Sequence, residues 1–209
     1  VDSVAQPIYG PWLAAPVPIA TTILAKLGQI ELHLTADAPT EAEGQAALAA
    51  AVRSLTDALG PSVYSVDDRP MERVVGDLLR ERGMTIAVAE SCSGGLLASR
   101  LTDVAGSSDY FLRGVVTYSN DAKTDLLGVP AELIAENGAV SEAVARAMAD
   151  GVRARARSGV AIGITGIAGP GGGTPERTSA RRPGGSVAGS SASADTDQSS
   201  TTSSTGANG

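Results

Sequence analysis

An alternation of strand and helix patterns between Pro70 and Pro175 limits the possible folds of this chain more than any other feature. Short apolar runs typical of buried strands occupy 85–89, 114–118 and 160–165, and helical stretches begin near 71, 96, 120 and 141. Strands that alternate with helices in this way predict a mainly parallel sheet with helices on both faces. The expected fold class is α/β, with a three-layer α/β/α domain.

The segments on either side of this domain differ from it. Residues 1–69 hold two alternating apolar and polar runs around Gly28, an Ala-rich helical stretch after Thr40 and a short apolar run at 63–66, which predict a small α+β unit. Residues 177–209 contain no Leu, Ile, Met or aromatic residue, so they cannot bury enough apolar surface to offset the entropy of ordering. We expect an α+β domain at 1–69, the α/β domain at 70–176 and a disordered Ser/Thr/Gly/Ala-rich tail at 177–209.

Charge and cysteine content exclude several classes of function. With a net charge of -7, the chain lacks the excess of Lys and Arg that neutralises phosphates, so no nucleic-acid partner is expected. Its one cysteine rules out an intrachain disulfide and fits a reducing compartment. No apolar run reaches the roughly 18 residues of a membrane helix, and no signal peptide is visible. We expect a cytoplasmic protein without a membrane partner.

Three polar segments follow the predicted strands, at 90–95, 118–123 and 165–173. Ligands of open α/β sheets bind beyond the carboxyl ends of the strands, so neighbouring strands would bring these segments to one crevice. Ser91 and Ser93 offer hydroxyl nucleophiles, and the glycines after them let the backbone approach a ligand. Lys123 could act as a base if desolvation lowers its pKa, and Tyr118 could relay a proton.

Elimination leaves a Ser–Lys pair as the simplest hydroxyl-based chemistry. The only histidine, His33, lies in the first region, so a Ser-His-Asp triad would need a contact between domains. No cluster of His, Cys and carboxylate residues has the spacing of metal ligands. The glycines after Thr165 form neither a Walker A loop, because no Gly-Lys-Ser/Thr follows, nor a dinucleotide fingerprint, because no helix follows.

Each of these residues also has a plain structural interpretation. Ser91 and Ser93 could cap a helix, Lys123 could be a solvated helix residue, and Cys92 could be a small buried hydrophobic residue. Glu90 could orient a ligand or be a loop charge. Taken singly, none of them indicates an enzyme.

Together, five motifs resemble the C-terminal domain of the CinA/PncC family, in the family's order. They are Ala87-Val-Ala-Glu-Ser-Cys-Ser-Gly-Gly-Leu-Leu-Ala98, Val104-Ala-Gly-Ser-Ser108, Gly114-Val-Val-Thr-Tyr-Ser-Asn-Asp-Ala-Lys123, Gly138-Ala-Val-Ser-Glu142 and Thr165-Gly-Ile-Ala-Gly-Pro-Gly-Gly-Gly-Thr-Pro175. Ser93 stands where the family usually has Thr, which keeps the hydroxyl. Residues 1–69 resemble the KH-like linker domain of longer CinA proteins, but no Gly-X-X-Gly loop is evident, so we infer no RNA role.

The resemblance implies a nicotinamide mononucleotide deamidase of pyridine nucleotide salvage, which forms nicotinic acid mononucleotide and ammonia without metal or cofactor. It implies that Ser91, rather than Ser93, attacks the amide carbon, that Lys123 takes its proton and that Tyr118 supports the transfer. The pyridine nucleotide or the oxyanion would be held by Glu90, Ser93, Gly94, Gly95, Asn120, Thr165, Gly166 and Gly169. A homodimer is also implied. The alternative is a catalytically inactive nucleotide-binding module, or an interaction module of competence or DNA-damage response.

The sequence departs from the family after Glu176. Family members continue with Lys-Pro-Val-Gly-Thr-Val, a further apolar strand and helices, whereas this chain stays polar from Arg177 to Gly209. A frameshift or a natural tail would each produce such a segment. Losing a strand and its helices would expose apolar surface and an unpaired sheet edge, so we expect a truncated domain of reduced stability.

Overall fold

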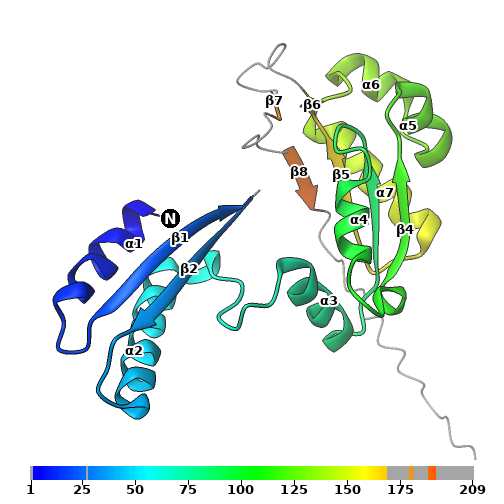
Figure 1. The fold of residues 1–209 in the computed structure, drawn as a ribbon. Coiled ribbons are helices and arrows are strands. Elements are labelled where there is room, and N and C mark those ends of the chain that lie inside the picture. Colours follow the sequence, from blue (N-terminus) through cyan, green and yellow to red (C-terminus); the bar gives the residue numbers. More distant parts are fainter. Residues whose placement is uncertain (1, 27, 169–178, 181–187, 192–209) are drawn as a thin grey trace, which may run out of the picture.

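The computed structural model describes residues 2–26, 28–168, 179–180 and 188–191. A four-stranded sheet forms the centre of the larger part, with the strand order β4-β3-β5-β8 (Figure 1). The strands are β3 (Ile86–Glu90), β4 (Phe111–Val116), β5 (Val160–Thr165) and β8 (Ala188–Ser191). β3 pairs in parallel with β4 and β5, whereas β8 runs antiparallel to β5. The fold is α/β, as the alternating patterns predicted.

Helices cover both faces of this sheet. The helices are α3 (Met71–Glu81), α4 (Leu96–Thr102), α5 (Asn120–Leu127), α6 (Ala131–Asn137) and α7 (Glu142–Ala156). Val88 of β3 packs in one apolar cluster with Leu101 of α4, and Ala89 packs in a second cluster with Met148 of α7. Successive side chains of a strand point to opposite faces, so these two clusters define the two faces of the sheet. No helix in the described part of the chain is long and apolar enough to cross a membrane.

Close packing of α7 on the sheet depends on a glycine. A Cβ atom at Gly163 of β5 would lie 2.1 Å from the carbonyl oxygen of Ala145 in α7, so only glycine lets α7 pack this closely on the sheet.

Every residue of β3 between the two helical layers is buried, which explains why its sequence is apolar throughout until Glu90.

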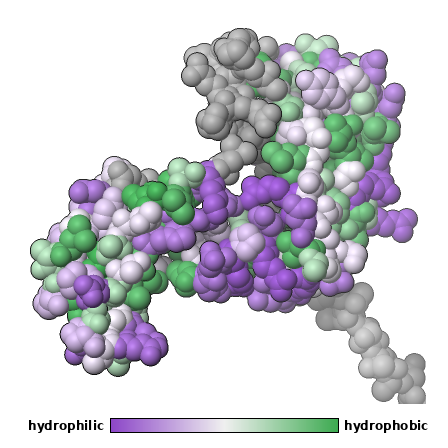
Figure 2. Space-filling view, viewed as in Figure 1, coloured by the Kyte–Doolittle hydropathy of each residue, from purple (hydrophilic) through white to green (hydrophobic). Residues whose placement is uncertain are grey.

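The smaller part of the molecule is an α+β unit built around one hairpin. β1 (Ile19–Lys26) pairs antiparallel with β2 (Gln29–Ala36), and α2 (Glu41–Leu59) packs on β2 after its cap, Thr40. α1 (Asp2–Tyr9) and two short 3-10 helices, Gly10–Ala14 and Gly60–Ser62, complete it. Apolar side chains of the hairpin remain exposed, and Figure 2 shows hydrophobic patches on this unit.

Some element predictions differ from the structure. The run at 63–66 forms no strand: no described strand pairs with it, and Val66 is 66% exposed. β4 begins and ends earlier than the expected 114–118. It includes Phe111 and Leu112 at its start and ends at Val116. Neither α1 nor α6 was predicted.

Two short strands fall in the segment 177–209, for which the sequence predicts disorder. They are β8 and β7 (Ser179–Ala180), and β7 pairs in parallel with β6 (Ile167–Ala168). Strand pairing uses backbone groups, so a polar segment can form it at an open sheet edge without apolar side chains. The rest of the segment 177–209 lies outside the described residues.

Candidate active site

The turn after β3 carries the first residues of the site. Glu90, the last residue of β3, is completely buried, and its carboxylate oxygens accept hydrogen bonds from the backbone N–H groups of Leu97 (3.1 Å) and Ala98 (2.8 Å). Gly94 and Gly95 have φ angles of +62° and +99°, which favour glycine, and they let the chain turn into α4. The resemblance implied a substrate contact for Glu90, whereas these bonds make it the cap of α4.

Ser91 and Lys123 meet at the carboxyl end of the sheet. The Nζ atom of Lys123 donates a hydrogen bond to Ser91 Oγ at 3.2 Å. Both side chains are buried, with 1% of Lys123 and 7% of Ser91 exposed. Ser119 accepts a hydrogen bond from the N–H of Ala122 and so caps α5, the helix that holds Lys123 in place. The structure therefore brings together the two residues for which the sequence predicted the roles of nucleophile and base.

Burial determines the protonation of Lys123. None of the ion pairs among the described residues involves it. Removal from water lowers the pKa of the Lys123 ammonium below its usual 10.5. This shift increases the fraction of neutral amine, the form that can accept a proton.

Backbone carbonyls orient the lysine amine. Nζ donates to the carbonyl oxygens of Thr117 at 2.9 Å, Tyr118 at 3.2 Å and Ser119 at 3.4 Å. A neutral amine has two N–H donors and one lone pair. Two of these carbonyls can take the two donors, which leaves the lone pair free to accept the hydroxyl proton of Ser91.

Sheet register places a further hydroxyl beside Ser91. Glu90 is paired with Val116 of β4 and Ile164 of β5, so the next residues, Thr117, Ser91 and Thr165, follow at one level across three strands. Thr165 donates its hydroxyl to the carbonyl of Ala139 at 2.7 Å. Thr117 is completely buried, and its hydroxyl has no partner among the described residues. The sequence analysis did not select Thr117, although its position at the end of a predicted strand was a usable signal.

Cys92 packs against the segment that follows β5. A Cβ atom at Gly166 would lie 2.9 Å from Cys92 Sγ, so only glycine leaves room for the thiol there. Burial raises the pKa of the Cys92 thiol, while hydrogen bonds from its own N–H and that of Ser93 act against the rise. The thiol is thus kept in its protonated form and fills space beside the Ser–Lys pair.

Of the other predicted residues, Tyr118, Asn120 and Ser93 make no side-chain hydrogen bond to this pair in the described part of the chain. Tyr118 is 70% exposed, and its backbone carbonyl rather than its hydroxyl contacts Lys123. Asn120 is exposed in the first turn of α5, and the buried hydroxyl of Ser93 has no partner among the described residues. Gly169 lies outside the described residues.

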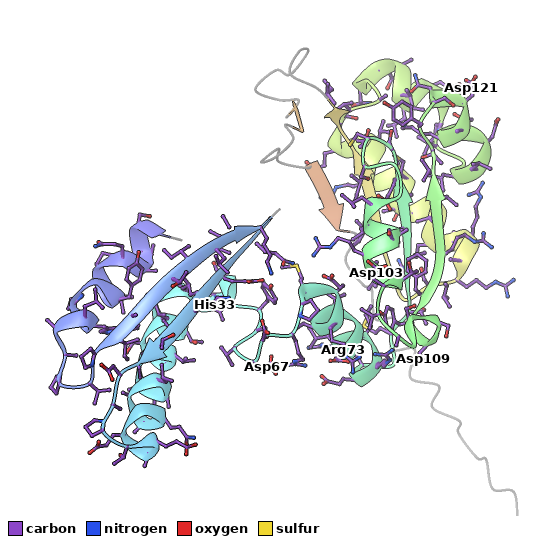
Figure 3. All side chains as sticks on the ribbon, viewed as in Figure 1. His33, Asp67, Arg73, Asp103, Asp109 and Asp121 are labelled. Atoms are coloured by element: carbon purple, nitrogen blue, oxygen red, sulfur yellow. The ribbon has the colours of Figure 1, made fainter. Side chains whose placement is uncertain are left out.

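His33 lies on β2 in the hairpin unit, outside the α/β part that carries the Ser91–Lys123 pair. His33 Nε2 lies 3.3 Å from Glu31 Oε2 on the same strand, and its side chain is 54% exposed. Figure 3 places His33 in the hairpin unit, whereas Asp121, in the first turn of α5, lies at the other end of the molecule. Within the described ranges, no group of three His, Cys, Asp or Glu residues could hold a metal ion.

A buried Ser–Lys pair beyond a mainly parallel sheet defines the class: an α/β protein with a serine and a lysine in hydrogen-bonding contact at the strand ends. The chain belongs to the CinA C-terminal domain family, whose model matches residues 68–206. The matched range contains β3 to β8 and every residue of the site.

Curated relatives agree with this assignment. The chain is 51% identical over 153 residues to a competence-damage inducible protein of Symbiobacterium thermophilum, which covers 73% of this chain and 36% of the relative. It is 48% identical over 177 residues to a CinA-like protein of Koribacter versatilis, covering 85% of this chain and 42% of the relative. The chain therefore spans well under half the length of these relatives.

Solved structures share the fold. A competence/damage inducible protein from Agrobacterium tumefaciens is 42% identical, with a TM-score of 0.50 over 57% of this chain and 76% of that one. A competence damage-inducible protein from Klebsiella pneumoniae is 34% identical, with a TM-score of 0.51 over 58% of this chain and 80% of that one.

Proposed function

We propose that the chain hydrolyses the carboxamide of a pyridine nucleotide, converting nicotinamide mononucleotide and water to nicotinic acid mononucleotide and ammonia. One observation carries the proposal: a buried lysine amine, which has no carboxylate partner among the described residues, lies 3.2 Å from a serine hydroxyl at the strand ends. This geometry is that of a nucleophile with its general base.

The chemistry requires two acyl transfers. Lys123 Nζ takes the proton of Ser91 as Oγ attacks the amide carbon, and the resulting ammonium gives this proton to the leaving nitrogen, which departs as ammonia. Ser91 then carries an acyl ester. A water molecule, deprotonated by the neutral Lys123, attacks this ester, and the returning proton restores the Ser91 hydroxyl as the carboxylate product leaves.

Three polar groups near the pair suit the rest of the substrate. The hydroxyl of Ser93 has no partner among the described residues, Asn120 is exposed in the first turn of α5, and a Cβ atom at Gly94 would meet no other atom within 4 Å. The choice of a pyridine nucleotide rests on the family resemblance of these segments rather than on their geometry.

A second candidate is an interaction module without catalysis. The names of the relatives, which refer to competence and damage, favour it. Such a module would bind a nucleotide or a protein through the same strand ends without releasing ammonia.

Ammonia release from nicotinamide mononucleotide decides between them. We expect release by the unaltered chain, loss of release in Ser91→Ala, and retained turnover in Ser93→Ala. If ammonia release were lost only in Ser93→Ala, Ser93 rather than Ser91 would be the nucleophile. No release by the unaltered chain, combined with a nucleotide-induced rise in melting temperature, would support the binding module instead.

A further inference from the structure

Glu90 is a buried acidic residue that the proposed reaction does not use. Its side chain is completely buried, and no ion pair among the described residues includes it. A buried carboxylate is costly unless hydrogen bonds compensate it, and here two backbone N–H groups do so. The N-cap position of α4 is Gly95, which has no side chain, so Glu90 replaces the missing cap from five positions earlier.

This cap closes a loop around Ser91. On one side the sheet holds the chain: the N–H of Ser91 donates to the carbonyl of Ile164 at 3.0 Å, and that of Thr117 donates to the carbonyl of Glu90 at 2.7 Å. On the other side, the Glu90 carboxylate holds the first turn of α4. The turn between them contains two consecutive glycines with positive φ, which resist displacement less than other residues do.

We infer that Glu90 is a positioning residue, which fixes the Ser91–Gly95 turn so that Ser91 Oγ stays within hydrogen-bonding distance of Lys123 Nζ. The inference rests on the proposed Ser–Lys chemistry but not on the identity of the substrate. Among the described residues, the hydrogen bonds of the Glu90 carboxylate both come from α4, so Glu90 acts through the turn.

The substitution Glu90→Gln tests this role at constant size. A glutamine offers one acceptor oxygen and turns an NH2 group toward the second N–H, so one of the two bonds is lost. A displacement of about 1 Å at a reacting group can cost on the order of 10²-fold in rate. We therefore expect kcat to fall about 10- to 100-fold in Glu90→Gln, with KM little changed. The pH midpoint of the reaction should stay constant, because Glu90 is not among the groups that shift the pKa of Lys123.

The experiment measures covalent labelling of Ser91 by a fluorophosphonate, located by mass spectrometry, beside ammonia release. The control is Leu101→Ala, which loosens the buried side of α4 but leaves both Glu90 bonds in place. We expect slow labelling in Glu90→Gln and Glu90→Asp, and labelling at the unaltered rate in Leu101→Ala, at a temperature where all variants are folded.

The outcomes separate the two proposals. Labelling that depends on Glu90 without any ammonia release would keep the positioning role and remove the proposed substrate. Unaltered labelling and kcat in folded Glu90→Gln would overturn the positioning role. Failure of both Glu90 variants to fold would also overturn it, because Glu90 would then serve the fold alone.

Discussion

The chain contains only two lysines, and they lie in regions of opposite character. Lys26 ends β1 in the hairpin unit, is 61% exposed, and forms an ion pair with Glu31 at 2.5 Å. Lys123 is buried in the α/β part, where its acceptors among the described residues are a hydroxyl and three backbone carbonyls.

The same side chain therefore has two different acidities. The hydrogen bond and charge of Glu31 raise the pKa of the Lys26 ammonium above 10.5, whereas burial lowers the pKa of Lys123 below it. Surface ion pairs contribute little to stability, so the first arrangement needs no functional explanation. A buried lysine without a carboxylate costs stability, and such groups are found most often where their chemistry is used.

Replacing each lysine in turn tests this contrast with the largest expected effect. Lys123→Met should lower kcat for ammonia release by about 10²–10⁴-fold, the usual contribution of a general base. Lys26→Met removes an amine of the same chemistry and should leave kcat and KM unchanged. Equal losses in the two variants would show that the buried lysine has no special role.

The pH dependence of turnover provides a second test. Below the lowered pKa of Lys123 the neutral amine is the minor form, so kcat should rise about tenfold per pH unit and then level off at a pH below 10.5. Lys26→Met should show the same curve. A rate that continues to rise up to pH 10.5 would mean that burial has not lowered the pKa.

Stability should follow the same titration with a defined sign. Between the lowered folded-state pKa of Lys123 and the unfolded value near 10.5, the unfolded chain binds more protons than the folded chain. The free energy of unfolding contributed by Lys123 should therefore increase with pH across that window and decrease as the pH falls through the folded-state pKa. Denaturant unfolding of the unaltered chain and of Lys123→Met should diverge in that direction.

A methyl group added beside Cys92, next to the Ser91–Lys123 pair, should have a smaller effect, and on stability. Gly166→Ala would bring a methyl group to 2.9 Å from Cys92 Sγ, and we expect a loss of about 1–3 kcal/mol in the free energy of unfolding. Cys92→Ala removes the obstacle, so the double variant should recover most of this loss. Simple addition of the two single effects would show that the two residues are not in contact.

Thr117 provides the mildest test. Replacing its unpaired buried hydroxyl by a methyl group in Thr117→Val should change the free energy of unfolding by less than about 1 kcal/mol. A rise in KM at unchanged stability would assign the hydroxyl to substrate binding. A large loss of stability would instead reveal a hydrogen-bond partner outside the described residues.

Much of the α/β part could be predicted because its apolar runs, helix caps and turn glycines all indicate the same alternation of strands and helices. The apolar run before Glu90, the capping serines before α5 and α7, and the glycines after Ser93 each have one simple structural interpretation. A Ser–Lys pair that includes Lys123 followed from elimination and from the rule that strand ends converge, whereas the choice of Ser91 over Ser93 came from the family resemblance. Neither argument required a knowledge of side-chain packing.

Other features depend on contacts that a pattern does not encode. Glu90 as the cap of α4 was missed because a cap normally lies directly before the helix, and here it lies at the end of the preceding strand. Tyr118 lies beyond the end of β4, and its side chain is 70% exposed, so its support of the proton transfer stays a prediction. The run at 63–66 had strand composition but no described neighbour with which to pair.

The most direct test of the central claim is an NMR pH titration of the unaltered chain carrying 13C-labelled lysine. Two lysines give two Cε signals, and Lys26→Met assigns them. The account predicts that Lys123 titrates below 10.5 and Lys26 above it. A Lys123 signal that titrates at or above that of Lys26 would contradict a poised base, and with it the proposed chemistry.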